Sequence, residues 1–200
     1  MTRVNASGIG KLYQSYGDWC PPPATLGGGQ GPKPPTSYTS GISLLVDLQR
    51  MVELATALGK SADAAMYASF RASLANDFNT AWLQHNGAYG SANGDGLQTA
   101  NSAALAIGGV VPAGVLANVS AALAVDVATT HNGHWSTGII GMRFLHAALT
   151  ASGQSTLALD TLLQVEYPSY GYWFNDPLEP ATTLNELPDG SSEGPGMNSR

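Results

Sequence analysis

The sequence predicts an all-α fold built from antiparallel helical hairpins. Apolar residues recur at spacings of three and four through six segments, and Gly or Pro separates most of these segments. No segment shows the clear alternation of apolar and polar residues that indicates a half-buried strand. Three helical pairs of unequal length with turn-rich connections are typical of an α/α toroid or a helical solenoid, rather than of a compact four-helix bundle.

The first 36 residues are expected to form a loop-rich segment of a single domain that spans residues 1–200. This segment contains Pro21-Pro22-Pro23, Gly27-Gly28-Gly29 and Gly31-Pro32-Lys33-Pro34-Pro35. None of these runs can continue a helix. Proline has no backbone N–H to donate a hydrogen bond, and glycine loses much conformational entropy in a helix.

The first predicted hairpin covers residues 37–82. Its first helix begins near residues 37–40 and stops at Gly59. Its apolar stripe consists of Ile42, Leu45, Leu48, Val52, Ala55 and Leu58. The second helix begins with Ser61 as a plausible cap and ends near Trp82.

Two further hairpins follow. The third helix is expected over residues 98–107, and the fourth begins at Pro112, which a helix tolerates in its first turn, and ends near Val127. The fifth follows residues 137–141, and the sixth covers residues 154–164. The apolar residues expected on the sixth helix are Leu157, Leu159, Leu162 and Leu163.

Composition excludes one class of partner. The chain has 200 residues, of which 44% are hydrophobic and only 11% charged, and its formal net charge is −6. The eight basic residues are scattered singly, so no cluster is available to neutralise the phosphates of a nucleic acid. Cys20 is the only cysteine, which excludes an internal disulfide.

The sequence indicates no membrane association. No charged start followed by an apolar run is present, so we expect no signal peptide in this chain. The apolar stretches look too short and too interrupted to span a bilayer. We therefore expect a soluble chain, and the sequence indicates no particular compartment.

A carboxylate beside aromatic residues is the first candidate site. Glu186 precedes the turn sequence Pro188-Asp189-Gly190, and residues 167–174 carry five aromatic rings. Aromatic rings stack on sugar faces, and a carboxylate handles a proton or a developing positive charge. Each of these roles has an alternative. Glu186 could instead be an ordinary exposed carboxylate of a turn, and Tyr172 and Trp173 could instead only pack a loop onto helix ends.

The second candidate cluster is His131, His134 and Trp135. A His-x-x-His spacing is compatible with a metal, but no third ligand follows at a recognisable spacing. Histidines that hydrogen-bond a sugar or a neighbouring backbone group are the favoured interpretation. We therefore expect neither a metal nor a cofactor.

Four motifs occur in order along the chain. They are Tyr16-Gly17-Asp18-Trp19-Cys20-Pro21-Pro22, Thr137-Gly138-Ile139-Ile140-Gly141, Tyr167-Pro168-Ser169-Tyr170-Gly171-Tyr172 and Ala181-Thr182-Thr183-Leu184-Asn185-Glu186. Together they resemble the catalytic domain of the bacterial α-L-rhamnosidases, an inverting family built on an (α/α)6 barrel. The resemblance covers residues 4–200.

The resemblance implies roles for particular residues. The Thr-Thr-x-Trp-Glu signature of the family falls on residues 182–186, so Glu186 would be the general base, with Asn185 in place of the usual Trp. Asp18 would accept a hydrogen bond from a hydroxyl of the sugar, and the ring of Trp19 would stack against the sugar. The other residues expected to bind the substrate are His134, Trp135, Tyr172 and Trp173.

The same resemblance implies that part of the barrel is missing. The general acid of the family belongs to a motif upstream of Gly-Asp-Trp that this chain does not match, although Asp18 is an alternative acid. A histidine-bearing segment that follows in the family is also absent. The chain is expected to be three hairpins of six, with weak or no activity alone.

Two functions from different classes follow from these residues. The first is a glycoside hydrolase-like domain that hydrolyses terminal α-L-rhamnosides with inversion. The second is a non-catalytic helical module that binds carbohydrate or self-assembles. The expected partner is a carbohydrate, a rhamnoside substrate, and two copies are expected to pair as a homodimer through the open edge of the half-barrel.

Overall fold

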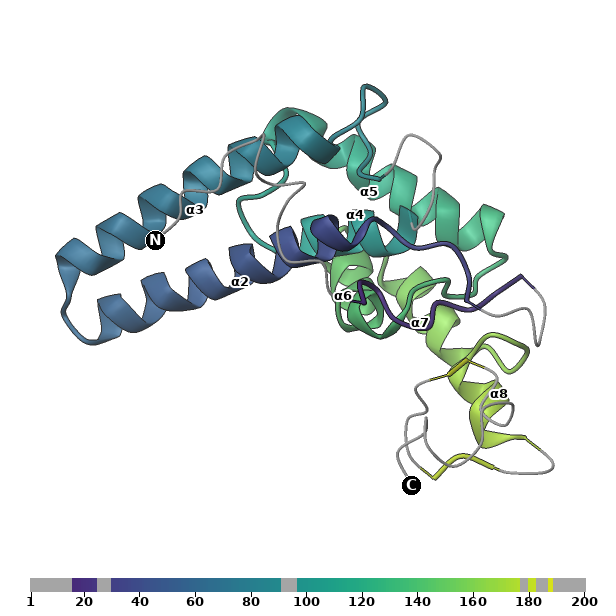
Figure 1. Ribbon diagram of the computed structural model, residues 1–200. Coiled ribbons are helices and arrows are strands. Elements are labelled where there is room, and N and C mark those ends of the chain that lie inside the picture. Colours follow the sequence, from purple (N-terminus) through teal and green to yellow (C-terminus); the bar gives the residue numbers. More distant parts are fainter. Residues whose placement is uncertain (1–15, 25–29, 91–96, 177–179, 183–186, 189–200) are drawn as a thin grey trace.

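The computed structural model describes residues 16–24, 30–90, 97–176, 180–182 and 187–188, and its regular elements are helices (Figure 1). Over these residues the only β-type pairing is an isolated bridge between Leu83 and Tyr89. The predicted all-α class is therefore confirmed.

The first two hairpins agree with the sequence prediction in order and in approximate bounds. α2 (Thr36–Ala57) pairs with α3 (Ser61–Trp82), and α4 (Leu97–Ala106) packs against α5 (Leu116–Val125). Figure 1 shows α2 and α3 as a long hairpin that extends away from the other helices. The structure adds a short 3-10 turn, η1 (Ala113–Val115), at the start of α5.

The third hairpin is followed by a helix that the sequence pattern did not indicate. α6 (Ile139–Ala151) pairs with α7 (Ser155–Leu163), and the short α8 (Tyr170–Phe174) comes next. Ser169 caps α8, because its hydroxyl accepts a hydrogen bond from the backbone N–H of Tyr172 at 2.9 Å. A single turn this short shows no helical periodicity, which is why it was missed.

The helix α4 lies at the centre of the fold. Each residue from Gln98 to Ala104 is buried, and α4 contacts α2, α5 and α6. Small side chains on its faces, mainly Ala and Ser, allow the neighbouring helices to approach closely. Buried polar groups find partners here: the hydroxyl of Tyr38 donates to the carbonyl of Ala100 at 2.6 Å.

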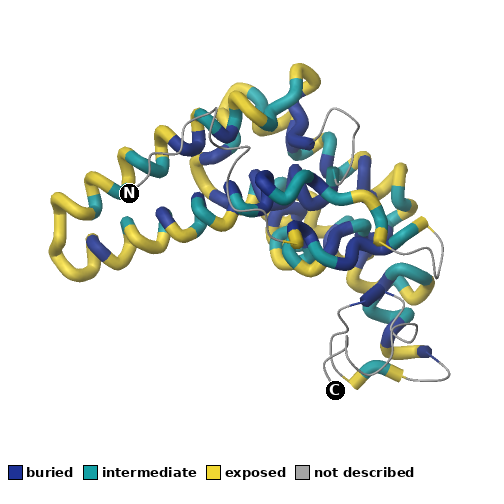
Figure 2. The backbone as a smooth tube through the Cα atoms, in the orientation of Figure 1, coloured by how far each residue is buried: buried dark blue, intermediate teal, exposed yellow. Residues whose placement is uncertain are grey.

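Two hydrophobic cores flank this central helix. The first lies between the α2–α3 hairpin and α4 and contains the rings of Tyr38, Phe78 and Tyr89. The second lies between α5, α6 and α8 and contains Trp135 and Trp173. Figure 2 shows that buried residues concentrate near α4 and that the far ends of α2 and α3 are mostly exposed.

Of the four leucines expected on α7, only Leu157 packs against a core. Leu159, Leu162 and Leu163 are 54%, 44% and 66% exposed, whereas Ala158 and Thr161 are buried. Within the described chain, α7 packs only against α6 and α8 with more than marginal contact, so its leucine-bearing side has no neighbour. The predicted burial of Leu58 on α2 fails in the same way, at 69% exposed.

One expectation about membranes needs correction. The helical run from Ala113 to Thr130 has 18 residues and is long and apolar enough to cross a membrane by length and composition. Three of its side chains, Val119, Leu123 and Val127, are nevertheless buried in the two cores. A single such helix is weak evidence, because core helices meet the same criterion.

Candidate functional site

A cavity of about 560 Å³ opens between the proline-rich N-terminal loop and the loop that connects α5 to α6. Pro22, Pro23 and Pro32 line one side of this cavity. Facing them are His131, His134, Trp135 and Ser136 from the α5–α6 loop, with Tyr167 and Pro168 from the loop before α8. The volume of this cavity, its aromatic walls and its few polar groups are typical of a site that binds a small molecule.

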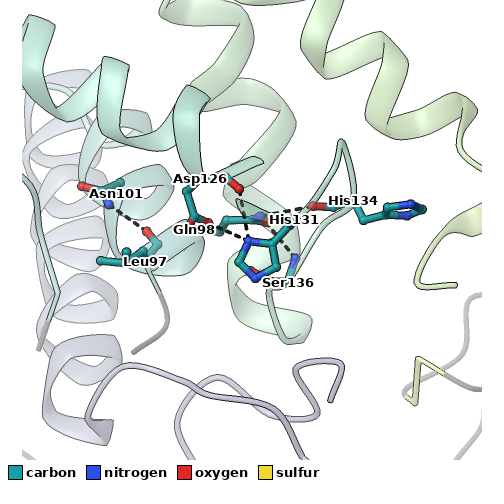
Figure 3. A network of polar contacts seen from close by, with 7 residues as sticks. All are labelled: Leu97, Gln98, Asn101, Asp126, His131, His134 and Ser136. Atoms are coloured by element: carbon teal, nitrogen blue, oxygen red, sulfur yellow. Dashed lines mark hydrogen bonds and ion pairs between the residues drawn. The ribbon is translucent and has the colours of Figure 1, made fainter. Parts of the chain in front are cut away.

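A buried glutamine positions the loop that carries two of the predicted site residues. The side-chain amide of Gln98 donates to the carbonyl of His134 at 3.2 Å, and its oxygen accepts from the backbone N–H of Ser136 at 2.8 Å (Figure 3). Gln98 is fully buried at the start of α4. These two hydrogen bonds hold the residues before and after Trp135, so the side chain of Gln98 fixes the backbone on both sides of that tryptophan.

His134 is held in one tautomer by the backbone. Its Nδ1 lies 3.1 Å from the carbonyl oxygen of Pro168. A carbonyl only accepts, so we assign the proton to Nδ1, which leaves Nε2 as an acceptor in the neutral ring. Figure 3 shows the ring of His134 pointing away from His131. The His-x-x-His pair therefore does not converge on one point.

His131 is paired with an acidic residue that the sequence analysis did not single out. Its Nδ1 lies 3.2 Å from Oδ2 of Asp126 and 3.1 Å from the backbone carbonyl oxygen of the same residue (Figure 3). The contact with the Asp126 carboxylate raises the pKa of His131 above its ordinary value, and burial opposes this only in part.

The pair is brought together by an irregular turn at the end of α5. Residues Asp126–Thr130 form one turn of π-helix, η2, which ends with a hydrogen bond of 3.0 Å from the N–H of His131 to the carbonyl of Asp126. Such turns are rare in proteins and frequent at functional sites. In the sequence, the sign of this pair was an aspartate five residues before a histidine. Residues five apart do not share a face of an α-helix, so the spacing did not indicate a contact.

The floor of the cavity is aromatic. Trp135 is 1% exposed, and its ring centroid lies 5.6 Å from that of Trp173 and 6.3 Å from that of Tyr170. Among described groups, the indole N–H of Trp135 has no hydrogen-bond partner. Tyr172 lies behind the cavity wall, with its ring centroid 5.4 Å from that of Tyr167 in an edge-to-face arrangement.

Trp173 makes the contacts of the packing alternative. It is 2% exposed, and its indole N–H donates to the carbonyl of Pro188 at 2.6 Å. Its carbonyl accepts from the N–H of Ala181 at 2.9 Å. The chain on either side of residues 183–186 is thus hydrogen-bonded to one tryptophan, whose ring packs against that of Trp135 at an interplanar angle of 58°. Glu186 and Asn185 themselves lie outside the described residues.

Asp18 is fully buried, and both of its carboxylate oxygens are occupied by protein donors. Oδ1 accepts from the N–H groups of Ile140 and Gly141 at 3.0 and 2.9 Å. Oδ2 accepts from the N–H of Gly138 at 2.8 Å and from the hydroxyl of Thr99. This arrangement supports a structural role for Asp18, because neither oxygen is left for a sugar hydroxyl.

Asp18 and Trp19 together cap the start of α6. The N–H of Ile139 donates to the carbonyl of Trp19 at 2.9 Å, and the next two N–H groups bind Asp18. These are donors that a helix cannot satisfy within itself. Glycine is required at 138, because a Cβ there would lie 2.8 Å from Oδ1 of Asp18. Two of the motifs of the sequence analysis therefore fit each other physically.

Trp19 lies apart from the cavity wall described above. Its half-buried ring meets Tyr16 edge to face, with ring centroids 5.0 Å apart, and the ammonium of Lys33 lies 5.3 Å from its centroid. The structure thus brings His134 and Trp135 to the cavity, with Tyr172 and Trp173 behind it, and places Asp18 and Trp19 at the start of α6.

Comparison with known proteins identifies a family over nearly the whole chain. Residues 3–200 match the model of the bacterial α-L-rhamnosidase six-hairpin glycosidase domain. The resemblance expected from the four motifs is therefore confirmed. An α-L-rhamnosidase from Formosa agariphila is 37% identical over 78 residues, which are 39% of this chain and 8% of that protein.

Solved structures share the fold. A structure of an α-L-rhamnosidase from Dictyoglumus thermophilum superposes with a TM-score of 0.78 at 29% identity, covering 91% of this chain. The α-L-rhamnosidase from Streptomyces avermitilis, crystallised with L-rhamnose, superposes over 97% of this chain with a TM-score of 0.75 at 23% identity. The chain covers 20% and 18% of these two relatives.

Proposed function

Because the chain belongs to the bacterial α-L-rhamnosidase six-hairpin glycosidase family, we propose that its cavity binds the sugar of an α-L-rhamnoside. The domain then serves the hydrolysis of terminal α-L-rhamnosides with inversion. The observation that carries this proposal is the cavity of about 560 Å³ between two loops, with polar imidazoles over an aromatic floor. Aromatic surface contacts the C–H groups of a sugar, and imidazoles hydrogen-bond its hydroxyls.

Within this proposal, His134 and Trp135 contact the sugar, and Tyr172 and Trp173 act from behind them. His134 offers Nε2 as an acceptor, since its Nδ1 is committed to Pro168. Trp135 and Trp173 pack against each other, and of the two it is Trp135 whose indole N–H lacks a partner in the described structure. A ligand hydroxyl that reached this N–H would satisfy a buried donor.

Glu186 is proposed as the general base that activates water. Inversion needs two carboxyl groups about 6.5–9.5 Å apart, one acting as acid and one as base. The segments on both sides of residues 183–186 are hydrogen-bonded to Trp173, whose ring packs against Trp135 of the cavity, and this supports the assignment. The match of this chain to about a fifth of its solved relatives supports the proposal that the acid is supplied from outside it.

The test is turnover of an aryl α-L-rhamnoside, together with calorimetric binding of methyl α-L-rhamnoside. We expect binding by the chain alone with little or no turnover, because loss of the acid commonly costs about 100-fold or more in rate. Any turnover present should be abolished in Glu186→Gln. The matched control is Glu53→Gln on the exposed face of α2. Absence of binding at millimolar sugar would overturn the proposal.

Two copies are further proposed to pair through the uncovered side of the third hairpin. Leu159, Leu162 and Leu163 are exposed together on α7. An apolar side of this kind promotes self-association, and a two-fold axis would bring two such sides together. Light scattering at high concentration should give a dimer mass for the wild type and a monomer mass for Leu162→Glu. A strictly monomeric wild type contradicts the pairing.

A further inference from the structure

Asp126 and His131 combine a buried carboxylate with a partly exposed imidazole at the cavity. The side chain of Asp126 is 6% exposed and that of His131 is 37% exposed. Both residues line the cavity. The imidazole is therefore the group through which the buried charge of Asp126 acts on whatever the cavity holds.

One oxygen of Asp126 depends on this imidazole. Oδ2 is buried and receives no well-aligned hydrogen bond from the described residues, and Nδ1 of His131 lies 3.2 Å away. A buried carboxylate is costly unless an opposite charge compensates it. Protonation of His131 supplies that charge, which is why the pKa of His131 is raised.

The second nitrogen of the same ring has no partner among the described residues. Figure 3 shows it on the side of the ring opposite Asp126. A protonated imidazole carries an N–H on both nitrogens, so Nε2 of His131 becomes a donor when the ring is charged. A ring that only capped the end of α5 would need no more than its Nδ1 contact with the carbonyl of Asp126.

We propose that His131, held by Asp126, binds the ligand of this cavity by donating a hydrogen bond from Nε2 to a hydroxyl of a neutral sugar. The inference rests on the proposed function, because it names a contact within the same cavity. The carboxylate of Asp126 offsets the charge of the imidazolium, so the pair is neutral as a whole and suits a hydroxyl better than an anion. Rhamnoside binding is therefore tighter when His131 is protonated.

The other ionisable groups around the cavity are few. His134, on the same loop, and Tyr167, before α8, are the remaining ionisable side chains among the described lining residues. α4 contributes the neutral Leu97, and the N-terminal loop contributes prolines and an alanine. His134 has a backbone carbonyl as its partner instead of a carboxylate. His131 is thus the ring whose charge the cavity stabilises.

The test is calorimetric titration of the full chain with methyl α-L-rhamnoside on either side of the ordinary histidine range, at about pH 5.5 and about pH 8. Charged hydrogen bonds are stronger than neutral ones, so we expect wild-type binding to be about five-fold tighter at the lower pH. His131→Gln keeps an N–H donor but cannot titrate, and should lose this pH dependence. His85→Gln makes the same change on an exposed turn and should behave as the wild type.

A second measurement uses only the wild-type protein, so it does not require that a variant folds. The NMR titration of His131 in the wild type should show its pKa rising further when the sugar is bound, because a ligand that prefers the protonated ring stabilises it. Binding that is equally tight at both pH values, or a pH dependence that survives in His131→Gln, overturns this inference and leaves the proposed function intact. Absence of binding at both pH values overturns the two together.

Discussion

Two buried carboxylates in this molecule are used in opposite ways. Asp18 lies at the start of α6 with both oxygens satisfied by four protein donors, and no part of it is exposed. Asp126 lies at the cavity with one buried oxygen that has only a partly exposed histidine beside it. A saturated carboxylate holds the fold together, whereas one left to an imidazole influences what binds beside that imidazole.

The difference lies in where the partners come from. The partners of Asp18 are backbone N–H groups and one hydroxyl that lie 81 to 123 residues away in sequence, so this side chain joins α4 and α6 to the N-terminal loop. The partner of Asp126 is five residues away and comes from a single turn. The hydrogen bonds of Asp18 hold together parts of the fold that are distant in sequence. The contact of Asp126 affects the protonation of one neighbouring histidine.

The largest expected effect is that of Asp18→Asn. An amide in this position turns an NH2 group toward N–H donors, so at least two hydrogen bonds of the α6 start are lost and replaced by repulsion. Breaking a buried charge network of this kind costs about 3–5 kcal/mol of unfolding free energy. Chemical denaturation measures it. Asp160→Asn, on the exposed face of α7, is the matched control and should change stability by less than about 0.5 kcal/mol.

A small loss of stability in Asp18→Asn, together with a large loss of sugar affinity, would instead indicate that Asp18 contacts the ligand. That result would restore the role that the family resemblance implied for it. We expect the opposite pattern, in which folding suffers first and any variant that folds still binds.

A smaller effect is expected for Gln98→Met, which keeps the side-chain length but removes both hydrogen bonds to the cavity loop. The carbonyl of His134 and the N–H of Ser136 lose their partner. Leaving such groups unsatisfied costs about 1–3 kcal/mol of stability. Because the same loop carries His134 and Trp135, rhamnoside affinity should fall as well. Unchanged affinity in a destabilised variant would show that the loop does not need this brace.

The smallest effect concerns the pH dependence of stability. The pKa of His131 is raised in the folded state, so its contribution is fully present below the ordinary histidine value and is lost as pH rises through the folded value. The stability difference between the wild type and Asp126→Asn should therefore be larger at about pH 5.5 than at about pH 8.5. Solvent screens the exposed ring, so the change is about 1 kcal/mol or less. A difference that grows with pH would contradict the pairing.

The sequence predicted the fold better than it predicted the site. α2, α4 and α6 were predicted because apolar spacing and Gly or Pro boundaries are local properties of the chain. Which side of α7 is buried could not be predicted, because it depends on which neighbours the helix meets. The partners of Asp18 could not be predicted, because its four donors are distant in sequence and a motif that resembles a family does not say which atoms bind a carboxylate.

The cavity shows the same limit. His134 and Trp135 were singled out as a polar and aromatic pair, and both line the cavity. Gln98 was read as the first turn of a helix, since nothing local indicates that its amide spans a loop 36 to 38 residues away. Asp126 was missed because a π-turn places it beside His131, at a spacing that an ordinary helix does not bring together.

The central claim is that the ligand binds in the cavity at His131, His134 and Trp135, and not at the start of α6. The chain has four tryptophans, and each reports on a different place. Trp135 forms the cavity wall, Trp173 lies behind it, Trp19 lies at the start of α6, and Trp82 ends α3. Their four indole N–H resonances can be followed separately by NMR during a titration with methyl α-L-rhamnoside.

We predict that the Trp135 resonance shifts most, that Trp173 follows weakly, and that Trp19 and Trp82 stay in place. Saturation of the Trp135 shift should give the same dissociation constant as calorimetry. A titration that moves Trp19 and leaves Trp135 unchanged would contradict the account, because it would place the ligand at the saturated carboxylate of Asp18.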